Sequence, residues 1–288
     1  MKTVGIVANV TKEGFVEAMR SVRGWAAEHS LRVMADESLE AHAPDGIECV
    51  PSTELATAAE LVFAFGGDGT LLYAVGMLAS AGLETPVIGV NLGSLGFLTQ
   101  IAGEELGEVL DRLDPSSLPL SRRMMLSAGV RGRDGVAMAL NDVVMAKGAD
   151  SRMMSFEARV DGELVTRYAA DGLILATPTG STAYSVSAGG PVVMPELEAI
   201  IATPICPHTL SMRSCVIPPH AEVEVEMLWC DDRTLVSTDG NRAFEICTDD
   251  VVVVRRAATN AMLVDVTSHP YYEILRKKMR WAGRVRER

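Results

Sequence analysis

The sequence lacks both of the commonest nucleotide-binding fingerprints. Neither the phosphate-loop pattern G-x-x-x-x-G-K-[ST] nor the dinucleotide pattern G-x-G-x-x-G occurs anywhere in its 288 residues. This absence excludes a Walker-type nucleotide-binding fold and the usual fingerprint of hydride-transfer enzymes. A phosphate-binding turn in this chain must therefore be built from a different arrangement of glycines.

Metal-binding and disulfide patterns are also absent. The five histidines never stand at i, i+4, and no C-x-x-C pair occurs, so the sequence offers no support for a zinc site. An odd number of scattered cysteines fits reduced thiols better than a disulfide framework, and reduced thiols are typical of the cytoplasm. We therefore expect a cytoplasmic protein. The five cysteines are Cys49, Cys206, Cys215, Cys230 and Cys247.

Positive charge and long hydrophobic runs are scarce. Lysine and arginine number 26 against 38 aspartate and glutamate residues, and the formal net charge of -12 argues against a surface that gathers nucleic acid. No stretch approaches the roughly 20 apolar residues of a membrane helix, and the opening MKTVGIVANVTKEG is too briefly apolar for a secretory signal. We expect neither nucleic acid nor a membrane as a partner. Any bound phosphate must be held by local geometry.

Short apolar runs alternate with helical patterns in the first part of the chain, from Val4 to about Pro119. Runs such as VGIVANV, LVFAFGG and PVIGVN are separated by amphipathic stretches, which predicts a parallel sheet wrapped by helices. Residues 1–119 are therefore expected to form an α/β nucleotide-binding domain. Ligands of such sheets collect at the carboxyl ends of the strands, where GGDGT follows Phe65 and NLGSLGF follows Val90.

A different pattern follows the proline- and serine-rich joint DPSSLPL. In HAEVEVEMLW apolar and acidic residues alternate, and a period of two indicates antiparallel strands with one face in water. Residues 120–266 are therefore expected to form a β-rich, sandwich-like domain. The remaining segment, 267–288, is strongly basic and predicted to be helical to about Trp281. We expect its apolar residues to dock on the protein; nucleic-acid binding by this tail is the less favoured alternative.

The GGDGT turn combines three glycines with one carboxylate. The glycines, which let a ligand approach the backbone amides, are Gly66, Gly67 and Gly69. A helix starting near Thr70 would add its dipole, so the turn predicts an anion cradle. Asp68 would repel a phosphate unless it faces an attacking hydroxyl instead, which suits a general base in phosphoryl transfer. The alternative is a turn aspartate that caps the following helix, and GGDG alone does not separate the two.

Residues 170–193, ADGLILATPTGSTAYSVSAGGPVV, place an apolar run before a turn dense in hydroxyls. So many polar groups are uneconomical in a core, although a serine- and threonine-rich turn would account for them. Small residues such as Ala183 permit close backbone contact, and Tyr184 offers an aromatic face to a base, which together indicate a nucleoside pocket. These residues alone leave both interpretations open. The hydroxyl residues are Thr177, Thr179, Ser181, Thr182, Ser185 and Ser187.

The motifs GGDGT, NLGSLGFL, RRMML, LNDVV, DGLILATPTGSTAYSVSAGGP and YYEILRKKMRW resemble those of the NAD kinase family, whose members make NADP with ATP. They occur in family order from residue 66 to residue 281. The resemblance implies an N-terminal α/β domain, a β-rich NAD-binding domain and a C-terminal segment that packs on the first domain. It also implies transfer of the γ-phosphoryl group of ATP to the 2'-hydroxyl of the adenosine ribose of NAD. Mg2+ or another divalent cation is the implied cofactor, and a homodimer or homotetramer is the implied assembly.

The resemblance assigns roles residue by residue. Asp68 corresponds to the base that activates the 2'-hydroxyl, the same role that the chemistry of the GGDG turn suggests. The other positions correspond to residues that contact the dinucleotide in the family. They are Gly67, Gly69, Asn141, Asp142, Arg152, Asp171, Thr182, Ala183, Tyr184, Ser187 and Asn241.

The chain departs from the family pattern at three positions. Asp142 is one methylene shorter than the glutamate of the family, and Asn241 stands where many members have glutamine. Ala169 stands where some members have arginine, so a charge that could meet the phosphoryl donor is missing. Arg167 is the candidate substitute, because residues two apart in a regular strand face the same side. The choice between ATP and inorganic polyphosphate as donor stays open at this point.

Two other functions compete with this interpretation. Diacylglycerol, sphingosine and phosphofructokinase-like kinases also carry GGDG-type turns, but the TPTGSTAY motif and the absence of an apolar membrane face disfavour them. A dinucleotide-sensing module that binds without turnover would be motivated by a lost base, and Asp68 is present.

Overall fold

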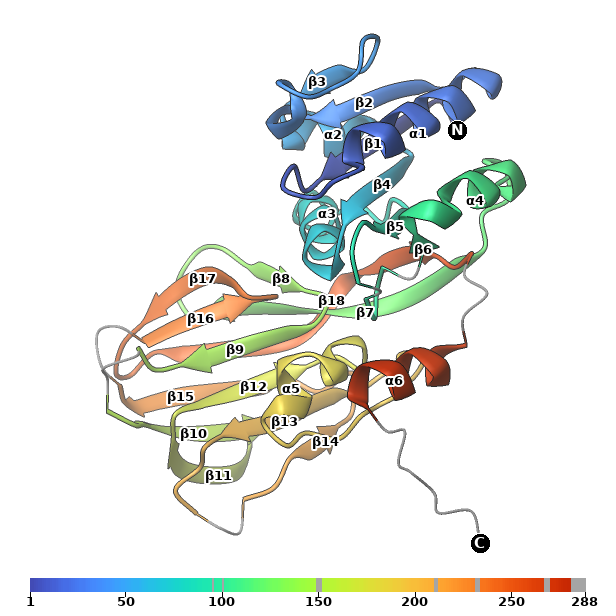
Figure 1. The fold of residues 1–288 in the computed structure, drawn as a ribbon. Helices are drawn as coiled ribbons and strands as arrows, with labels where there is room; N and C mark the ends of the chain where they lie inside the picture. The colour runs from blue at the N-terminus through green and yellow to red at the C-terminus, as the bar shows by residue number, and fades with distance from the viewer. Residues whose placement is uncertain are drawn as a thin grey trace, which may run out of the picture. The chain divides into compact units, whose positions relative to one another are not determined.

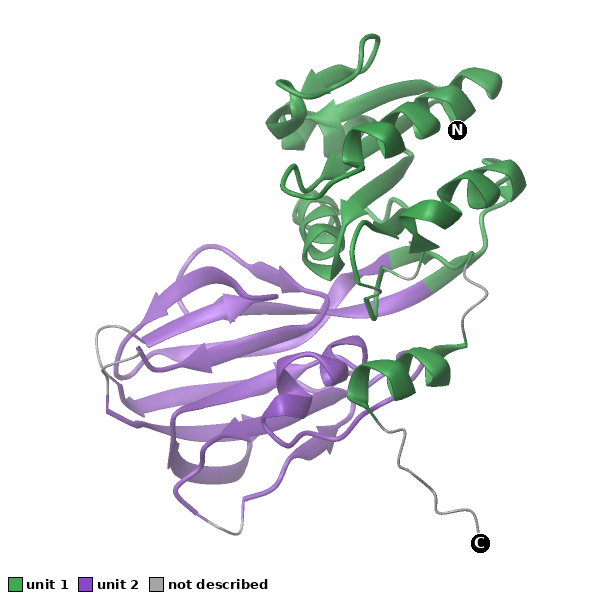
Figure 2. Cartoon of the chain, in the orientation of Figure 1, with its two compact units in different colours: residues 1–121, 262–288 green, residues 122–261 purple. Residues whose placement is uncertain are grey.

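The chain forms two compact units, each with its own hydrophobic core (Figures 1 and 2). Unit 1 comprises Met1–Ser121 and Met262–Arg288, and unit 2 comprises Arg122–Ala261. The computed structural model describes residues 1–94, 96–99, 101–148, 152–209, 212–230, 234–266 and 270–280.

Unit 1 contains a parallel sheet, as the alternating sequence pattern predicts. Its strands lie in the order β3-β2-β1-β4-β5, and β1 pairs in parallel with both β2 and β4. The central strand β4 is an uninterrupted apolar run, LVFAFG, because both of its faces are buried. The strands are β1 (Thr3–Ala8), β2 (Arg32–Asp36), β3 (Glu48–Val50), β4 (Leu61–Gly66), β5 (Val87–Asn91) and β6 (Ile101–Ala102), which pairs with β5.

Helices cover both faces of this sheet. Helices α1 and α4 pack on the face that carries Ile6 and Phe63, whereas the alternate strand residues Gly5 and Gly89 face α2 and α3. A Cβ at Gly89 would lie 2.6 Å from Leu71 Cδ1, so glycine lets α3 approach the sheet closely. The helices are α1 (Phe15–Glu28), α2 (Ser52–Ala58), α3 (Asp68–Ser80) and α4 (Leu106–Arg112), with short 3-10 helices η1 (Glu37–Leu39) and η2 (Gly103–Glu105).

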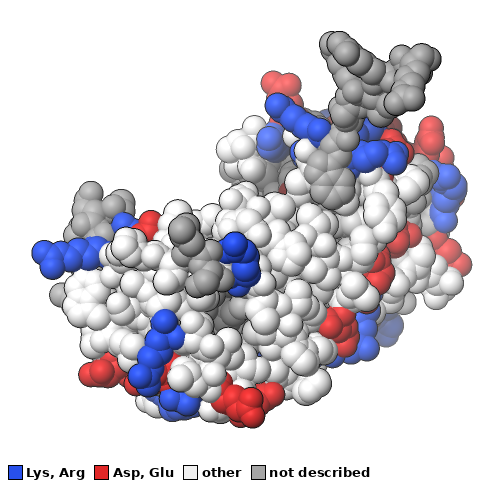
Figure 3. Space-filling model, turned by 90° about the horizontal axis from the view of Figure 1, so that it is seen from below, with Lys and Arg blue, Asp and Glu red and all other residues white. Residues whose placement is uncertain are grey.

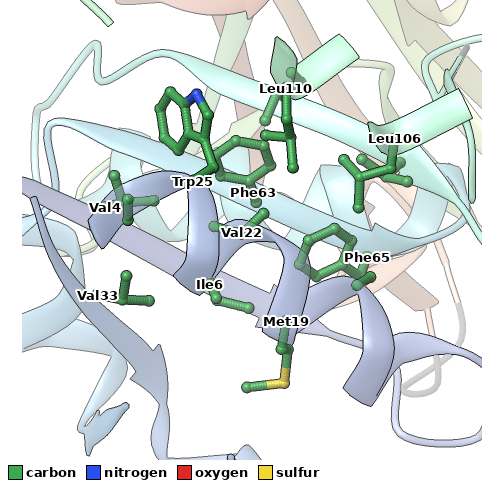
Figure 4. Close-up of a cluster of buried hydrophobic side chains, with 14 of the residues drawn as sticks. Val4, Ile6, Met19, Val22, Trp25, Val33, Phe63, Phe65, Leu106 and Leu110 are labelled. Atoms are coloured by element: carbon green, nitrogen blue, oxygen red, sulfur yellow. The ribbon is translucent and has the colours of Figure 1, made fainter. Parts of the chain in front are cut away.

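The core of unit 1 lies between α1 and the centre of the sheet (Figure 4). In α1 the buried residues Met19, Val22 and Trp25 recur every three positions, which places them on one face of the helix. This face meets two aromatic rings of β4. The ring of Phe63 lies 5.9 Å from Trp25 and 6.0 Å from Phe65, measured between centroids.

Helix α3 begins at Asp68, two residues before the predicted start at Thr70. The residue that precedes the first turn is Gly67, which is extended and has no side chain to cap the helix. Asp68 is therefore the first helical residue and not the capping aspartate that one reading of GGDGT suggested. Its carboxylate is free to bind another part of the chain.

Unit 2 is built from two antiparallel sheets, which confirms the predicted β-rich domain. One sheet has the order β14-β13-β12-β9-β16-β17. In the other, β11, β10, β15 and β18 pair in that order, with β7 beside β18 and β8 beside β7. Side chains from both sheets form one core. The strands are β7 (Leu120–Val130), β8 (Ala137–Ala139), β9 (Asp142–Ala146), β10 (Met154–Val160), β11 (Glu163–Ala170), β12 (Gly172–Ala176), β13 (Ile200–Ile205), β14 (Cys215–Ile217), β15 (Val223–Trp229), β16 (Thr234–Thr238), β17 (Asn241–Ile246) and β18 (Val251–Val264).

The alternation that predicted these strands is visible in β15. Val223, Val225 and Met227 are buried in the core of unit 2, and the glutamates between them are partly exposed. The tight turn between β10 and β11 is formed by Asp161 and Gly162, which have φ angles of 50° and 80°. Positive φ angles at both turn residues match the twist of the flanking strands.

The C-terminal segment contains the predicted helix. Helix α6 (Tyr271–Met279) buries Ile274 and Leu275. Its predicted continuation to Trp281 lies outside the described residues.

The surface carries dispersed charge. On the face seen in Figure 3, lysine and arginine side chains lie in separate groups with uncharged surface between them. Among the helices of the described residues, none has both the length and the apolar character needed to cross a membrane.

Removing the Phe63 ring should destabilise unit 1 strongly. The side chain is 0% exposed and contacts two other rings, so Phe63→Ala leaves a cavity that should lower the free energy of unfolding by about 3–5 kcal/mol. Urea unfolding followed by circular dichroism measures the change. The matched truncation Val136→Ala, at a side chain that is 66% exposed, should change stability by less than about 0.5 kcal/mol. A loss below about 1 kcal/mol for Phe63→Ala would contradict this packing.

Candidate functional site

Three turns follow β1, β4 and β5 at the carboxyl edge of the unit 1 sheet. Backbone hydrogen bonds tie the first residue of each outer turn to the end of β4. The Asn9 amide donates to the Phe65 carbonyl at 2.8 Å, and the Leu92 amide donates to the Gly66 carbonyl at 2.9 Å. The expectation that GGDGT and NLGSLGF meet at one edge of the sheet is therefore confirmed.

The carboxylate of Asp68 holds the turn that follows β5. Its Oδ1 accepts hydrogen bonds from the Leu98 amide at 3.0 Å and from the Thr99 amide and hydroxyl, both at 2.9 Å. Its Oδ2 accepts one from the Phe97 amide at 2.9 Å. A Cβ at Gly96 would lie 1.9 Å from Oδ1, so only glycine leaves room for the carboxylate. Asp68 thus has an anchoring role that the sequence did not reveal.

The glycines of GGDGT are of two kinds. A Cβ at Gly66 would lie 2.2 Å from Thr70 Oγ1, so this glycine makes room for protein atoms. A Cβ at Gly67 or Gly69 would meet nothing within 4 Å, so open space lies beside this part of the backbone. The space belongs to a cavity of about 370 Å³. The cavity is lined by Val7, Ala8, Asn9, Lys12, Ser38, Gly67, Gly69, Thr70 and Tyr73.

This cavity suits an anion. The first amides of α3 have no intrahelical acceptor, and the helix dipole favours negative charge at this end. Lys12 adds an ammonium group, and Tyr73, which is 47% exposed, adds an aromatic surface. The sequence analysis missed Lys12 and Tyr73, because neither belongs to a motif and only the fold brings them to GGDGT.

In unit 2, the segments STDGN and TPTGS both bind the backbone of the LNDVV segment. The carboxylate of Asp239 accepts hydrogen bonds from three successive backbone amides. The donors are Leu140 (2.8 Å), Asn141 (2.7 Å) and Asp142 (3.2 Å). Thr177 binds the carbonyls of the same segment, with its amide on Asn141 at 2.8 Å and its hydroxyl on Leu140 at 2.6 Å. Asp239 was not among the expected site residues, although it stands two residues before Asn241 in STDGN.

The turn after β12 packs directly on this segment. A Cβ at Gly180 would lie 2.0 Å from the carbonyl oxygen of Asn141, so the two backbones touch. The Tyr184 amide donates a hydrogen bond to the Asp142 carboxyl. The ring of Tyr184 is 46% exposed and open to a ligand. The structure thus brings Asn141, Asp142 and Tyr184 together.

The hydroxyl-rich segment folds into η3 (Thr179–Thr182) and α5 (Tyr184–Ser187). The expectation that its hydroxyls are too many for a core is wrong, because they bind within the protein. Ser181 Oγ donates to the Pro178 carbonyl at 2.7 Å, and Ser185 Oγ lies 2.9 Å from Thr203 Oγ1. Ala183 is half-buried and Ser187 is exposed, whereas the five buried hydroxyl residues are Thr177, Thr179, Ser181, Thr182 and Ser185.

Three further expected contact residues stand at or near the ends of strands in unit 2. Asp171 precedes β12, at the opposite end of that strand from Thr177, and its carboxylate lies 3.5 Å from Lys147 Nζ. Arg152 is exposed and forms no ion pair with any residue of the described ranges. Asn241 is the exposed first residue of β17.

Arg167 was the candidate to replace the positive charge that is missing at Ala169, but its guanidinium has another partner. The pairing of β11 with β10 is regular from Arg167 to Ala169, so the two side chains face the same side of the sheet. However, Arg167 is engaged in an ion pair with Glu157, which is 1% exposed and also pairs with Arg159. The guanidinium of Arg167 is therefore already committed to a buried carboxylate.

Asp142 is a buried carboxyl group that lies near the partly buried carboxylate of Asp239. Burial, reinforced by the charge of Asp239, raises the pKa of Asp142 to about 7, and the hydrogen bond from Tyr184 only partly opposes this. Burial also raises the pKa of Asp239, against the effect of its three amide donors. No group of three or more His, Cys, Asp or Glu side chains gathers as a metal site within the described residues.

Comparison with known families decides the identity of the chain. The model of the ATP-NAD kinase N-terminal domain matches residues 4–114, and that of the C-terminal domain matches residues 140–266. The chain belongs to the NAD kinase family. The first match includes all residues that line the cavity beside Gly67 and Gly69. The second includes the hydrogen bonds between Asp239 and the LNDVV segment.

Individual NAD kinases are similar over nearly their whole length. The NAD kinase of Desulforamulus reducens is 40% identical over 283 residues, which cover 97% of this chain and 98% of that protein. The NAD kinase of Geobacter metallireducens is 38% identical over 287 residues, which cover 99% and 100%. Among solved structures, yeast NADH kinase in complex with NADH superposes with a TM-score of 0.86 at 25% identity, covering 99% of this chain and 89% of that one. An NAD kinase from Archaeoglobus fulgidus in complex with ATP gives a TM-score of 0.75 at 25% identity, covering 98% and 100%.

The activity follows from this membership. As a member of this family, the protein phosphorylates NAD to NADP with ATP as the donor. The lipid-kinase, sugar-kinase and sensing alternatives are therefore set aside.

The buried Asp142 should make the stability of the protein depend on pH. Its folded-state pKa of about 7 lies above its ordinary value of 3.8, so the folded state binds the proton more tightly and the free energy of unfolding falls as pH rises between these values. Asp142→Asn keeps an oxygen for the Tyr184 amide and removes the cost of ionising a buried carboxyl group. When the pH is raised from 5 to 8, the free energy of unfolding of wild type should therefore fall relative to that of the variant by on the order of a few kcal/mol. Urea unfolding at both pH values measures this, and an equal pH dependence of the two proteins would refute it.

Proposed function

We propose that unit 1 binds the triphosphate of ATP and supplies the catalytic base, and that unit 2 binds NAD. The observation that carries this proposal is the pair of glycine turns joined by the Asp68 carboxylate beside an open cavity. A turn that exposes helix-terminal amides beside a held carboxylate provides both an anion site and a proton acceptor.

The phosphates of ATP are proposed to lie on the backbone of Gly67 and Gly69. The open space beside both glycines and the free amides at the start of α3 support this placement. The absence of a three-ligand cluster among the described residues fits a divalent cation that arrives as the magnesium complex of ATP, held mainly by phosphate oxygens. Such a cation would offset the charge that develops on the transferred group.

Asp68 is proposed to accept the proton of the ribose 2'-hydroxyl. As that oxygen bonds to the γ-phosphorus of ATP and the bond to ADP breaks, the proton passes to the carboxylate. Oδ2 receives one amide hydrogen bond, from Phe97, and therefore keeps acceptor capacity for the hydroxyl. The three bonds on Oδ1 fix the direction in which the carboxylate points.

NAD is proposed to bind around LNDVV and the turn after β12. The hydrogen bonds that tie these segments together, and the half-exposed ring of Tyr184, support a preformed pocket. Asp239 acts there as a positioning residue, since it holds the backbone of Asn141 and Asp142. The proposed contact residues in unit 2 are Asn141, Asp142, Arg152, Asp171, Thr182, Ala183, Tyr184, Ser187 and Asn241.

We also propose the roles of the domains, the cellular compartment and the assembly of the enzyme. The stretch 1–119 is the α/β nucleotide-binding domain, 120–266 is the NAD-binding domain, and 267–288 packs on the first domain. The enzyme acts in the cytoplasm as a homodimer or homotetramer. Its unpaired thiols are consistent with a reducing compartment, since all five cysteines are free.

Replacing the proposed base should abolish most of the turnover. Purified protein is supplied with NAD, ATP and magnesium, and NADP is followed with an NADP-specific dehydrogenase. We expect Asp68→Asn to lower kcat by about 10²- to 10⁴-fold, the usual contribution of a positioned base. NAD binding, measured by calorimetry, should be retained.

The control variant Thr99→Val distinguishes a catalytic role of Asp68 from its role in anchoring the turn after β5. It removes the Thr99 hydroxyl bonds to Asp68 Oδ1 and Asn91 Nδ2 but leaves the carboxylate in place. A loss of kcat below about tenfold is expected from the loss of neutral anchoring bonds. If Thr99→Val loses as much activity as Asp68→Asn, or if Asp68→Asn turns over at the wild-type rate, Asp68 is not the base.

Disturbing Asp239 should weaken NAD binding selectively. In Asp239→Asn an amide NH2 replaces an acceptor oxygen that faces backbone donors, so the LNDVV segment should shift. We expect KM for NAD to rise about 10- to 100-fold with KM for ATP nearly unchanged. Asp249→Asn is the matched control, because Asp249 also has a positive φ angle (70°) and is exposed. Equal increases in both KM values would argue against the positioning role.

A further inference from the structure

The turn after β1 is built to hold Lys12 in one place. Asn9 Oδ1 accepts hydrogen bonds from the Thr11 amide at 3.0 Å and the Thr11 hydroxyl at 2.8 Å. The Asn9 carbonyl accepts one from the Lys12 amide at 3.0 Å. The Asn9 amide in turn donates to Phe65, the residue directly before GGDGT. The backbone that carries Lys12 is therefore tied to the strand that carries the proposed donor site.

The side chain of Lys12 lies beside the cavity and points toward Gly93. It lines the same cavity of about 370 Å³ as Gly67 and Gly69. A Cβ at Gly93, in the turn after β5, would lie 3.6 Å from Lys12 Nζ. The ammonium group thus extends from the turn after β1 toward the turn after β5, past the open glycines of the turn between them.

The ammonium group of Lys12 has no acidic partner within the described part of the chain. Its ammonium forms no ion pair with a residue in the described ranges, and the carboxylate of Asp68 is bound by Phe97, Leu98 and Thr99 instead. Among the described residues that line the cavity, Lys12 alone carries a positive charge. An ammonium held at the edge of an anion cavity without an acidic partner is suited to bind a phosphate.

Two other cations that could have met the donor are missing or engaged. The sequence has no phosphate-loop lysine, and Arg167 is paired with the buried Glu157. We propose that Lys12 binds the β- and γ-phosphate oxygens of ATP and provides the positive charge on the donor side of the reaction. This inference rests on the proposed placement of the triphosphate at Gly67 and Gly69.

The test compares Lys12→Met with Lys12→Arg. Lys12→Met should raise KM for ATP about 10- to 100-fold, the loss expected for a hydrogen bond between charged groups, and leave KM for NAD within about twofold. Lys12→Arg should restore most of the affinity for ATP. Lys278→Met, which removes an exposed charge from α6, should leave both KM values unchanged.

Direct binding separates this inference from the proposed reaction. Calorimetry with inorganic tripolyphosphate should show the same 10- to 100-fold loss for Lys12→Met whether or not the protein makes NADP. Unchanged tripolyphosphate binding and unchanged KM for ATP would overturn the role of Lys12 while leaving the kinase reaction intact. Equal losses for ATP and NAD would also overturn it, because they indicate a structural defect. If Lys12→Met does not fold, as judged by circular dichroism, Lys12→Gln replaces it in both measurements.

Discussion

The carboxylate of Asp68 is the contact on which the proposed donor site depends. It joins the first residue of α3 to three amides and one hydroxyl in the turn after β5. All four partners donate, so the side chain must be an acceptor on both of its oxygens, which an amide side chain is not. Because amide dipoles surround this carboxylate, less of its charge reaches a phosphate bound nearby. On the proposed placement of ATP, this arrangement would let a carboxylate and bound phosphates share one glycine-rich turn.

Unit 2 contains a second aspartate whose carboxylate binds three successive backbone amides. Asp239 binds the amides of Leu140, Asn141 and Asp142, as Asp68 binds the amides of Phe97, Leu98 and Thr99. Three successive N–H groups that converge on one anion form a concave, positively polarised backbone segment. In unit 2 the segment that is fixed in this way carries two of the proposed ligand contacts, Asn141 and Asp142. The pKa of Asp142 is raised mainly by burial and secondarily by the charge of Asp239.

The sequence predicted what depends on local periodicity and glycine chemistry. The parallel sheet, the antiparallel strands such as β15 and the glycine turn before α3 all follow from residues close together in the chain. The anchoring role of Asp68 did not follow, because its partners lie 29 to 31 positions away. Asp239 is 97 to 99 positions from its partners.

The buried hydroxyls after β12 were misjudged for a related reason. Their cost in a core depends on whether backbone acceptors lie within reach, and composition does not show that. The carbonyl of Leu140, which accepts from the Thr177 hydroxyl, lies 37 positions away in the chain. Local patterns therefore predict elements and candidate turns, whereas the polar contacts that shape a site depend on the tertiary fold.

The charge of the protein constrains how it can bind its substrates. The chain has a formal net charge of -12, and both of its substrates are anions, so the long-range field opposes their approach. Affinity must come from short-range contacts that a Debye length of about 8 Å does not screen away. Backbone amides meet this need without adding acidic partners, and a single ammonium such as that of Lys12 adds charge only where the phosphates would lie. On the proposed placement of ATP, Gly67 and Gly69 would contribute to affinity because open space beside them lets phosphates reach the backbone amides.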